Sequence, residues 1–344
     1  MSAARAGPGP AARGMVLGAA ALLAAVLLAF AAGRYPVSPA ELLRALAAAA
    51  GIPGVDPVDE TTHGILFAVR GPRVLAAVMV GAALAAAGVA FQALFRNPLV
   101  SPDILGASSG AALGAMIGIF VSLGGPGIQL CAFAGGLAAV ALVGWVGAGA
   151  RGLEPLLGLL LAGLVVGALL AAGVGLLKAI ADPHDQLPAM TFWLLGSLAG
   201  ASPASLVPLA LAVALGGATL FALRWRLDVL ALPADEARAL GAPVATLRLA
   251  VIASATLVTA ACVSAAGIVG WIGLVVPHLA RLIAGPSFAR LLPLSALLGA
   301  GLLLVVDTGA RTLAEVEIPL GVLTAVVGAP CFLWLLRAAG RRQP

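Results

Sequence analysis

The chain has 344 residues, of which 62% are hydrophobic and only 10% are charged, and its formal net charge is +5. A soluble domain is about 45–50% apolar and about 25% charged, so this composition excludes a soluble globular protein and predicts an integral membrane protein. Because a helical span needs about 20 apolar residues, the chain has room for about a dozen spans at most and none for a large soluble domain.

Apolar runs separated by polar residues or by proline and glycine predict transmembrane helices. We expect ten of them, near residues 15–34, 72–94, 104–123, 128–149, 154–180, 203–224, 246–266, 268–284, 290–311 and 319–338. The runs are too long for barrel strands, so the predicted fold class is an all-α polytopic membrane protein. Residues 15–338 form one transmembrane domain in this prediction, between short tails at residues 1–14 and 339–344.

The arginines predict the orientation of the helices. With the N-terminus in the cytoplasm, thirteen of the 19 basic residues fall on the cytoplasmic side. Basic residues favour that side of a membrane, so both termini are predicted to be cytoplasmic.

Two connections between the predicted helices are longer than turns. The first, about residues 35–70, lies outside and contains "VSPAELLRALAAAAG", a surface helix that Ser38 is expected to cap. The second, about residues 226–246, lies inside and contains "LPADEARALGAP". Pro233 suits the first turn of a helix there, and Gly241 suits its end. This short helix is either an ordinary connector or a rigid element offered to a cytoplasmic protein.

Glycines recur at every fourth residue through "GASSGAALGAMIG", from Gly106 through Gly110 to Gly118. Such a face lets another backbone approach closely. Packing inside one subunit is the favoured interpretation, and the alternative is a face that lines or gates a pathway, with the hydroxyls of Ser108 and Ser109 turned toward it. The preceding "LFRNPLVSPDILG" must interrupt the helix because of its two prolines, as a structural turn or as the edge of a functional cavity.

Three arginines are predicted at the outer ends of helices, against the usual bias: Arg70 and Arg73 in "VRGPRV", and Arg311. They are either anchors in the interface or a docking surface for carboxylates of an extracytoplasmic partner. Asp307 is the only carboxylate well inside a predicted span, and Arg311 follows it by one helical turn. This spacing predicts a structural ion pair, with a proton relay as the alternative.

The stretch "GWIGLVVPHLARLIAG" brings a proline, a histidine and an arginine into an apolar helix. We expect its glycines to allow close packing and Pro277 to break the helix. His278 and Arg281 then share a face near the cytoplasmic end. With no second histidine or acid nearby in sequence, His278 is expected to shape this end of the helix rather than to bind a ligand.

No catalytic or metal-binding pattern is present in the sequence. The three histidines and three cysteines are scattered, and the only lysine, Lys178, lies in no phosphate-binding loop. We therefore expect no catalytic residue, metal, bound cofactor or nucleic-acid partner. If transport is driven by ATP, another polypeptide must bind and hydrolyse it with Mg²⁺.

Seven blocks in order carry a resemblance to a known family. They are "RGPR", "FQALFRNPLVSPDILGASSGA", "FWLLGSL", "ADEARALG", "GIVGWIGLVVPHLARLIAG", "DTGAR" and "EIPLGVLTAVVGAPCFLWLL". The chain resembles the FecCD-type permeases, the membrane subunits of bacterial ABC importers for iron chelates, heme and cobalamin, over nearly its whole length. The resemblance implies a type II importer permease of the inner membrane. Its expected partners are a second permease copy, two cytoplasmic ATPases and a periplasmic binding protein.

The resemblance also implies roles for particular residues. Arg70, Arg73 and Arg311 match the arginines that receive the binding protein. The element that couples to the ATPase is Pro233, Asp235, Glu236, Ala237, Arg238, Leu240 and Gly241, where the usual Gly-Glu pair is replaced by Pro233-Ala234. The candidates for the translocation path or its gating are Gly106, Ser108, Ser109, Gly110, Trp193, Pro277 and His278.

The predicted spans offer mostly small and apolar side chains, which suits a large amphipathic cargo recognised elsewhere. This favours heme, a ferric siderophore or a corrinoid over a bare ion, with a slight preference for heme. A proton-coupled secondary transporter that works without an ATPase, with Asp307 as its ionisable site, is the alternative function.

Overall fold

A computed structural model describes residues 10–33, 35–56, 58–149 and 154–340. Its helices are α1 (Pro10–Ala31), α2 (Pro39–Ala49), α3 (Glu60–Gly64), the π-helix η1 (Ile65–Arg70), α4 (Gly71–Leu94), the 3₁₀ turn η2 (Pro102–Leu105), α5 (Ala107–Phe120), α6 (Gly125–Gly149), α7 (Pro155–Ile180), α8 (Gln186–Leu195), α9 (Pro203–Leu230), α10 (Ala234–Ala239), α11 (Val244–Ala266), α12 (Ile272–Ala284), α13 (Phe288–Thr312) and α14 (Leu320–Gly340). The described parts of the chain contain no strand, which confirms the all-α class. Most of the two predicted tails lies outside the described residues.

Every predicted span corresponds to a helix. Among the described residues, seven helical segments are long and apolar enough to cross a membrane, and three more, in α5, α12 and α14, are apolar but shorter. The number of crossings therefore stays a prediction. Helix α8, between the fifth and sixth predicted spans, was not expected.

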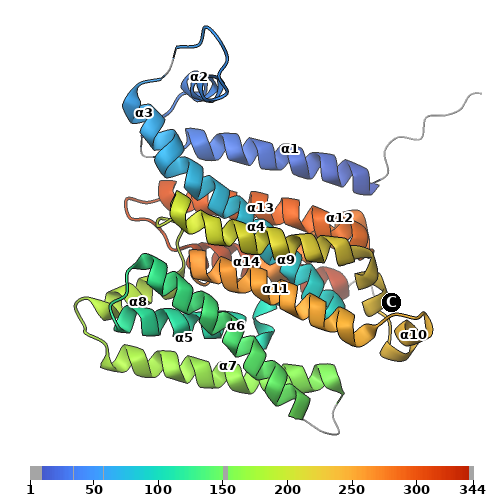
Figure 1. Cartoon of the computed structure of the whole chain (residues 1–344). Coiled ribbons are helices and arrows are strands. Elements are labelled where there is room, and N and C mark those ends of the chain that lie inside the picture. Colours follow the sequence, from blue (N-terminus) through green and yellow to red (C-terminus); the bar gives the residue numbers. More distant parts are fainter. Residues whose placement is uncertain (1–9, 34, 57, 150–153, 341–344) are drawn as a thin grey trace, which may run out of the picture.

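Helix α4 lies at the centre of the bundle and packs against α9, α11, α12 and α13 (Figure 1). Its sequence is mostly alanine, glycine and valine, and almost every residue from Val80 to Leu94 is buried. Small side chains let the neighbouring backbones come close. At the tightest of these contacts, a Cβ added to Gly88 would overlap the carbonyl oxygen of Gly273 in α12.

The glycine face of α5 packs inside the chain. Side chains at Gly110 and Gly114 would collide with the backbone carbonyls of Gly135 and Cys131 in α6, so these glycines allow the two helices to touch. Gly106 has a different role, because it connects η2 to α5. Its φ of 77° lies in the left-handed region, which glycine adopts without strain.

The predicted break at Pro277 is wrong in position. Helix α12 runs without interruption through Pro277, and the irregular segment precedes it, from Gly267 to Trp271. Because proline has no N–H, it leaves the carbonyl of Gly273 without its helical donor. That carbonyl lies against Gly88 of α4.

The second predicted helix also begins earlier than expected. Helical structure is continuous from Glu60 to Leu94, and the segment Ile65–Arg70 within it is a π-helix. Pro72 cannot donate a hydrogen bond, and the preceding turn is wider, with the N–H of Gly71 bonded to the carbonyl of Leu66. Arg70 therefore lies within a helix rather than at its end.

Candidate functional site

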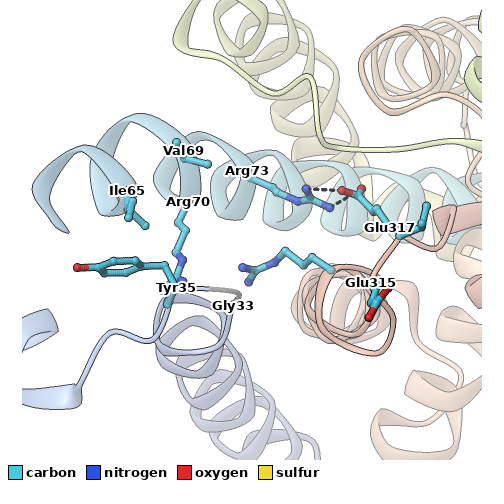
Figure 2. Close-up of a pocket in the computed structure, with 10 residues that line it drawn as sticks. Gly33, Tyr35, Ile65, Val69, Arg70, Arg73, Glu315 and Glu317 are labelled. Atoms are coloured by element: carbon cyan, nitrogen blue, oxygen red, sulfur yellow. Dashed lines mark hydrogen bonds and ion pairs between the residues drawn. The ribbon is translucent and has the colours of Figure 1, made fainter. Parts of the chain in front are cut away.

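A group of five charged residues lies at the end of the bundle where α1 stops and η1 passes into α4. We call Arg70, Arg73, Arg311, Asp307 and Glu317 the arginine cluster. Its members come from η1, α4, α13 and the loop between α13 and α14. Figure 2 shows Arg73 facing Glu317 beside a cavity of about 600 Å³.

Arg73 holds two carboxylates at once. Its Nε donates to Asp307 Oδ1 at 2.9 Å, while Nη1 and Nη2 donate to the two oxygens of Glu317 at 3.0 and 2.7 Å (Figure 2). The Asp307 side chain is 0% exposed and that of Arg73 is 12% exposed. A buried carboxylate needs such a partner, and the planar fork of arginine suits it.

Arg70 and Arg311 donate hydrogen bonds to carbonyl groups at the end of α1 and just beyond it. The last carbonyls of a helix have no donor within the helix. Arg311 donates to the carbonyls of Ala29 and Ala32 at 2.6 and 3.0 Å, and Arg70 donates to those of Phe30 and Tyr35. Cations are favoured at this negative end of the helix dipole.

Gly33 makes room for this arrangement, because a Cβ there would overlap the guanidinium of Arg70. Arg70 is only 5% exposed. In this conformation, Arg70 and Arg311 fasten α1 to η1 and α13, and little of Arg70 is open to a partner.

Glu317 connects the cluster to the helices behind it. Ser197, just after α8, donates its hydroxyl to Glu317 at 3.0 Å, and the neighbouring Gly196 accepts the N–H of Leu320 in α14 at 3.0 Å. Burial tends to raise the pKa of Glu317, but the guanidinium of Arg73 outweighs it and the pKa is lowered. Glu317 is thus held as a carboxylate against Arg73.

The predicted pair of Asp307 and Arg311 lies with Nε 3.5 Å from Oδ2. Arg73 is nearer, at 2.8 Å, and sequence reasoning missed it as the main partner of Asp307. The helical spacing indicated Arg311 correctly as a neighbour. Glu317 belongs to the "EIPLG" block, but nothing in the sequence indicated that it contacts Arg73.

The predicted coupling segment lies at the opposite end of the bundle (Figure 1). Helix α10 follows Pro233 and ends at Leu240, before Gly241 with its φ of 76°. Leu240 is 68% exposed, whereas Ala237 is 1% exposed and packs inside. Asp235 and Arg238 form an exposed salt bridge at 2.8 Å, and the side chain of Glu236 is exposed too.

Comparison with known proteins identifies the family. The family model of the FecCD transport family matches residues 21–338. The chain belongs to this family.

Relatives of this FecCD permease have different cargoes in their names. The molybdate import system permease protein MolB of Haemophilus influenzae is 38% identical, over 90% of this chain and 91% of that protein. The hemin transport system permease protein HmuU of Yersinia pestis is 42% identical, over 78% of this chain and 81% of that protein. A structure described as an inward-facing conformation of a metal-chelate type ABC transporter is 35% identical, with a TM-score of 0.84 over 94% of this chain and 98% of that one.

This chain is therefore a multi-pass permease subunit of an ABC importer and is not itself an ATPase. Permeases of the family work with ATPase subunits and substrate-binding proteins.

The residues predicted to line the path of the FecCD permease do not gather at one place. Ser108 is buried and donates to Asp103 in η2, and Ser109 is partly buried. Trp193 lies on α8 and lines a separate cavity of about 570 Å³ between α6, α9 and α11.

The two path candidates on α12, Pro277 and His278, also differ in their surroundings. Pro277 is buried, and His278 is partly buried with no hydrogen bond to the residues that the structure describes. Arg281 donates to Gln92 of α4 at 3.1 Å, and Gln92 donates to the carbonyl of Leu274 at 3.4 Å. Arg281 thus fixes the end of α12 to α4, near His278.

Proposed function

We propose that two copies of this permease form an inner-membrane importer for an iron-containing chelate or a corrinoid, with heme favoured among them. Both termini and α10 lie on the cytoplasmic side, and the arginine cluster faces the periplasm. The observation that supports this proposal is that η1, which carries Arg70, and α10 lie at opposite ends of one bundle (Figure 1). A binding protein would dock at one end and an ATPase at the other, as the family's mode of working requires.

The apolar character of the helices supports a large, weakly held cargo. The cavity beside Trp193 is lined by Ile128, Phe133 and Leu209, with only a few hydroxyls and one amide among its other residues. An oxyanion would need converging donors to replace its water, whereas a porphyrin or corrin ring presents a large apolar surface. The hemin and cobalamin permeases among the relatives agree with this cargo class.

Uptake by proteoliposomes tests both the mechanism and the cargo. With the cognate ATPase and binding protein present, we expect ATP-dependent uptake of heme that excess molybdate does not inhibit. Uptake of molybdate without uptake of any chelate would overturn the cargo. Uptake driven by a pH gradient, with this chain alone and no ATP, would overturn the importer mechanism in favour of the proton-coupled alternative.

Docking at the arginine cluster is tested through Glu317. A carboxylate of the binding protein could reach Arg73 by displacing Glu317, which is 26% exposed, but not Asp307, which is 0% exposed. Glu317→Gln weakens the internal ion pair and should therefore tighten docking severalfold, whereas Arg73→Gln should weaken it about tenfold. Arg44→Gln, an exposed arginine on α2, is the control. Equal docking of the Glu317 and Arg73 variants would remove the cluster from the interface.

Leu240 gives the test of coupling. Because Leu240 is 68% exposed on the α10 end, Leu240→Glu should release the ATPase in pull-down from detergent without unfolding the permease. Leu43→Glu, at a residue that is 63% exposed on α2, introduces the same charge at the other end and should have no effect. Retained ATPase in the Leu240 variant would show that α10 is a simple connector.

A further inference from the structure

A groove lies at the α10 end of the bundle, and Arg238 is the one residue of the predicted coupling segment that lines it. Its volume is about 880 Å³, and its walls are α6, the start of α7 and the first half of α11. Helix α6 packs against both α7 and α11, and the groove follows the space between those two. The walls are apolar and include Leu137, Val140, Leu159, Ile252 and Leu257.

The mouth of this groove carries two cations. Arg248, on the second turn of α11, and Arg238, on α10, both line it. Arg248 is partly buried and makes no hydrogen bond or salt bridge with the described residues. Arg238 is paired with Asp235, but both side chains are exposed, and such surface pairs contribute little.

Other charges near the mouth do not cancel these cations. The charged groups that act on Arg248 are Glu154, Arg96 and Arg238. Glu154, which also caps α7 through the N–H groups of Leu156 and Leu157, is one carboxylate beside the three cations Arg248, Arg96 and Arg238. The mouth is therefore suited to an anion.

Thr256 lies on the inner wall of the groove, eight residues beyond Arg248 and about 12 Å along the helix. It is 4% exposed and its hydroxyl oxygen is buried, so it presents no accessible polar group there. The wall of the groove is therefore apolar at this depth.

We propose that this groove binds one anionic phospholipid. Its phosphate lies between Arg238 and Arg248, and its acyl chains follow the apolar walls. An apolar groove that opens beside two arginines at a membrane surface complements this kind of molecule and no soluble anion. The site is independent of the cargo path and goes beyond the proposed function.

Native mass spectrometry of the purified full-length permease tests the charge preference. Phosphatidylglycerol and phosphatidylcholine with identical acyl chains are titrated in turn. About 1 kcal/mol for each arginine near the surface corresponds to about fivefold in affinity. Arg248→Gln should therefore reduce phosphatidylglycerol binding about fivefold, and its combination with Arg238→Gln about thirtyfold, with phosphatidylcholine unchanged. Arg290→Gln, an exposed arginine on α13 outside the groove, is the control.

A second pair of variants tests the groove itself. A side chain at Gly144 would enter open space, and Gly144 lines the groove. Gly144→Phe should fill it and reduce the binding of both lipids. Gly149, on the same helix, also faces open space but does not line the groove, so Gly149→Phe should leave binding unchanged.

Four results would overturn the proposal. The first three are equal binding of the two lipids by the wild-type protein, an unchanged preference in the double arginine variant, and normal lipid binding in Gly144→Phe. The fourth is loss of the bound lipid when the ATPases and a second permease copy are assembled, because a subunit then covers the groove. None of these measurements depends on transport.

Discussion

Removing Arg73 should destabilise the bundle strongly, because it leaves Asp307 buried without its main partner. The Arg73 side chain is 12% exposed and that of Asp307 is 0% exposed, so solvent cannot replace the lost ion pair. Breaking a buried pair from one side costs about 3–5 kcal/mol. Arg311, with its Nε 3.5 Å from Asp307, compensates in part, and we therefore expect about 3 kcal/mol for Arg73→Met.

The double variant Arg73→Met/Asp307→Leu separates the ion pair from simple packing. Replacing both charges of a buried pair by apolar side chains is often neutral or stabilising, so its stability should return to within about 1 kcal/mol of the wild type. Thermal unfolding in detergent measures this as a fall of about 6 °C in Tm for the single variant, at about 2 °C per kcal/mol. Arg44→Met on α2 is the exposed control. A double variant as unstable as the single one would refute the reasoning.

Two further changes test the packing and the charge of the molecule. Gly88→Ala should lower the free energy of unfolding by about 1–3 kcal/mol, because its Cβ overlaps the carbonyl of Gly273. Gly144→Ala places its Cβ in open space and should be neutral or stabilising. Thermal unfolding measures both. The lowered pKa of Glu317 means that its ion pair contributes stability above the unfolded pKa of about 4.3 and loses it as the pH falls through the folded value. Glu317→Gln should therefore unfold with less dependence on pH between 6 and 3 than the wild type, and an equal dependence would contradict the assignment.

The helices could be predicted because their signals are local. An apolar run is readable without knowing its neighbours, and the capping box of Ser38 and Glu41 fixes the start of α2 as the sequence indicates. The same holds for α10 between Pro233 and Gly241. Where the helix departs from the α pattern, the sequence is less informative. The sequence shows both Pro72 and Pro277 but not their different effects. Pro72 follows a π-helix, whereas Pro277 lies inside an uninterrupted α-helix.

The arginine cluster could be predicted only in part, because its contacts are distant in sequence. Arg73 and Asp307 are 234 positions apart, and only the packing of α4 on α13 brings them together. The i,i+4 rule could find Arg311 beside Asp307, but not the stronger partner across the helix pair. Likewise, no pattern in the sequence linked Arg70 to the carbonyls at the end of α1.

These contacts change what docking at the cluster would require. Arginines at a helix end were predicted to face a partner, yet Arg70 and Arg311 complete the hydrogen bonding of α1, and Arg73 neutralises a buried acid. A docking partner therefore competes with groups of the permease itself, and the most exposed competitor is Glu317. Because Glu317 also accepts from Ser197 beside α8, its displacement would loosen the link between α4 and the α8–α14 contact. If a binding protein docks here as proposed, docking and the arrangement of these helices are joined through one carboxylate, which makes Glu317→Gln the sharpest probe of this end of the molecule.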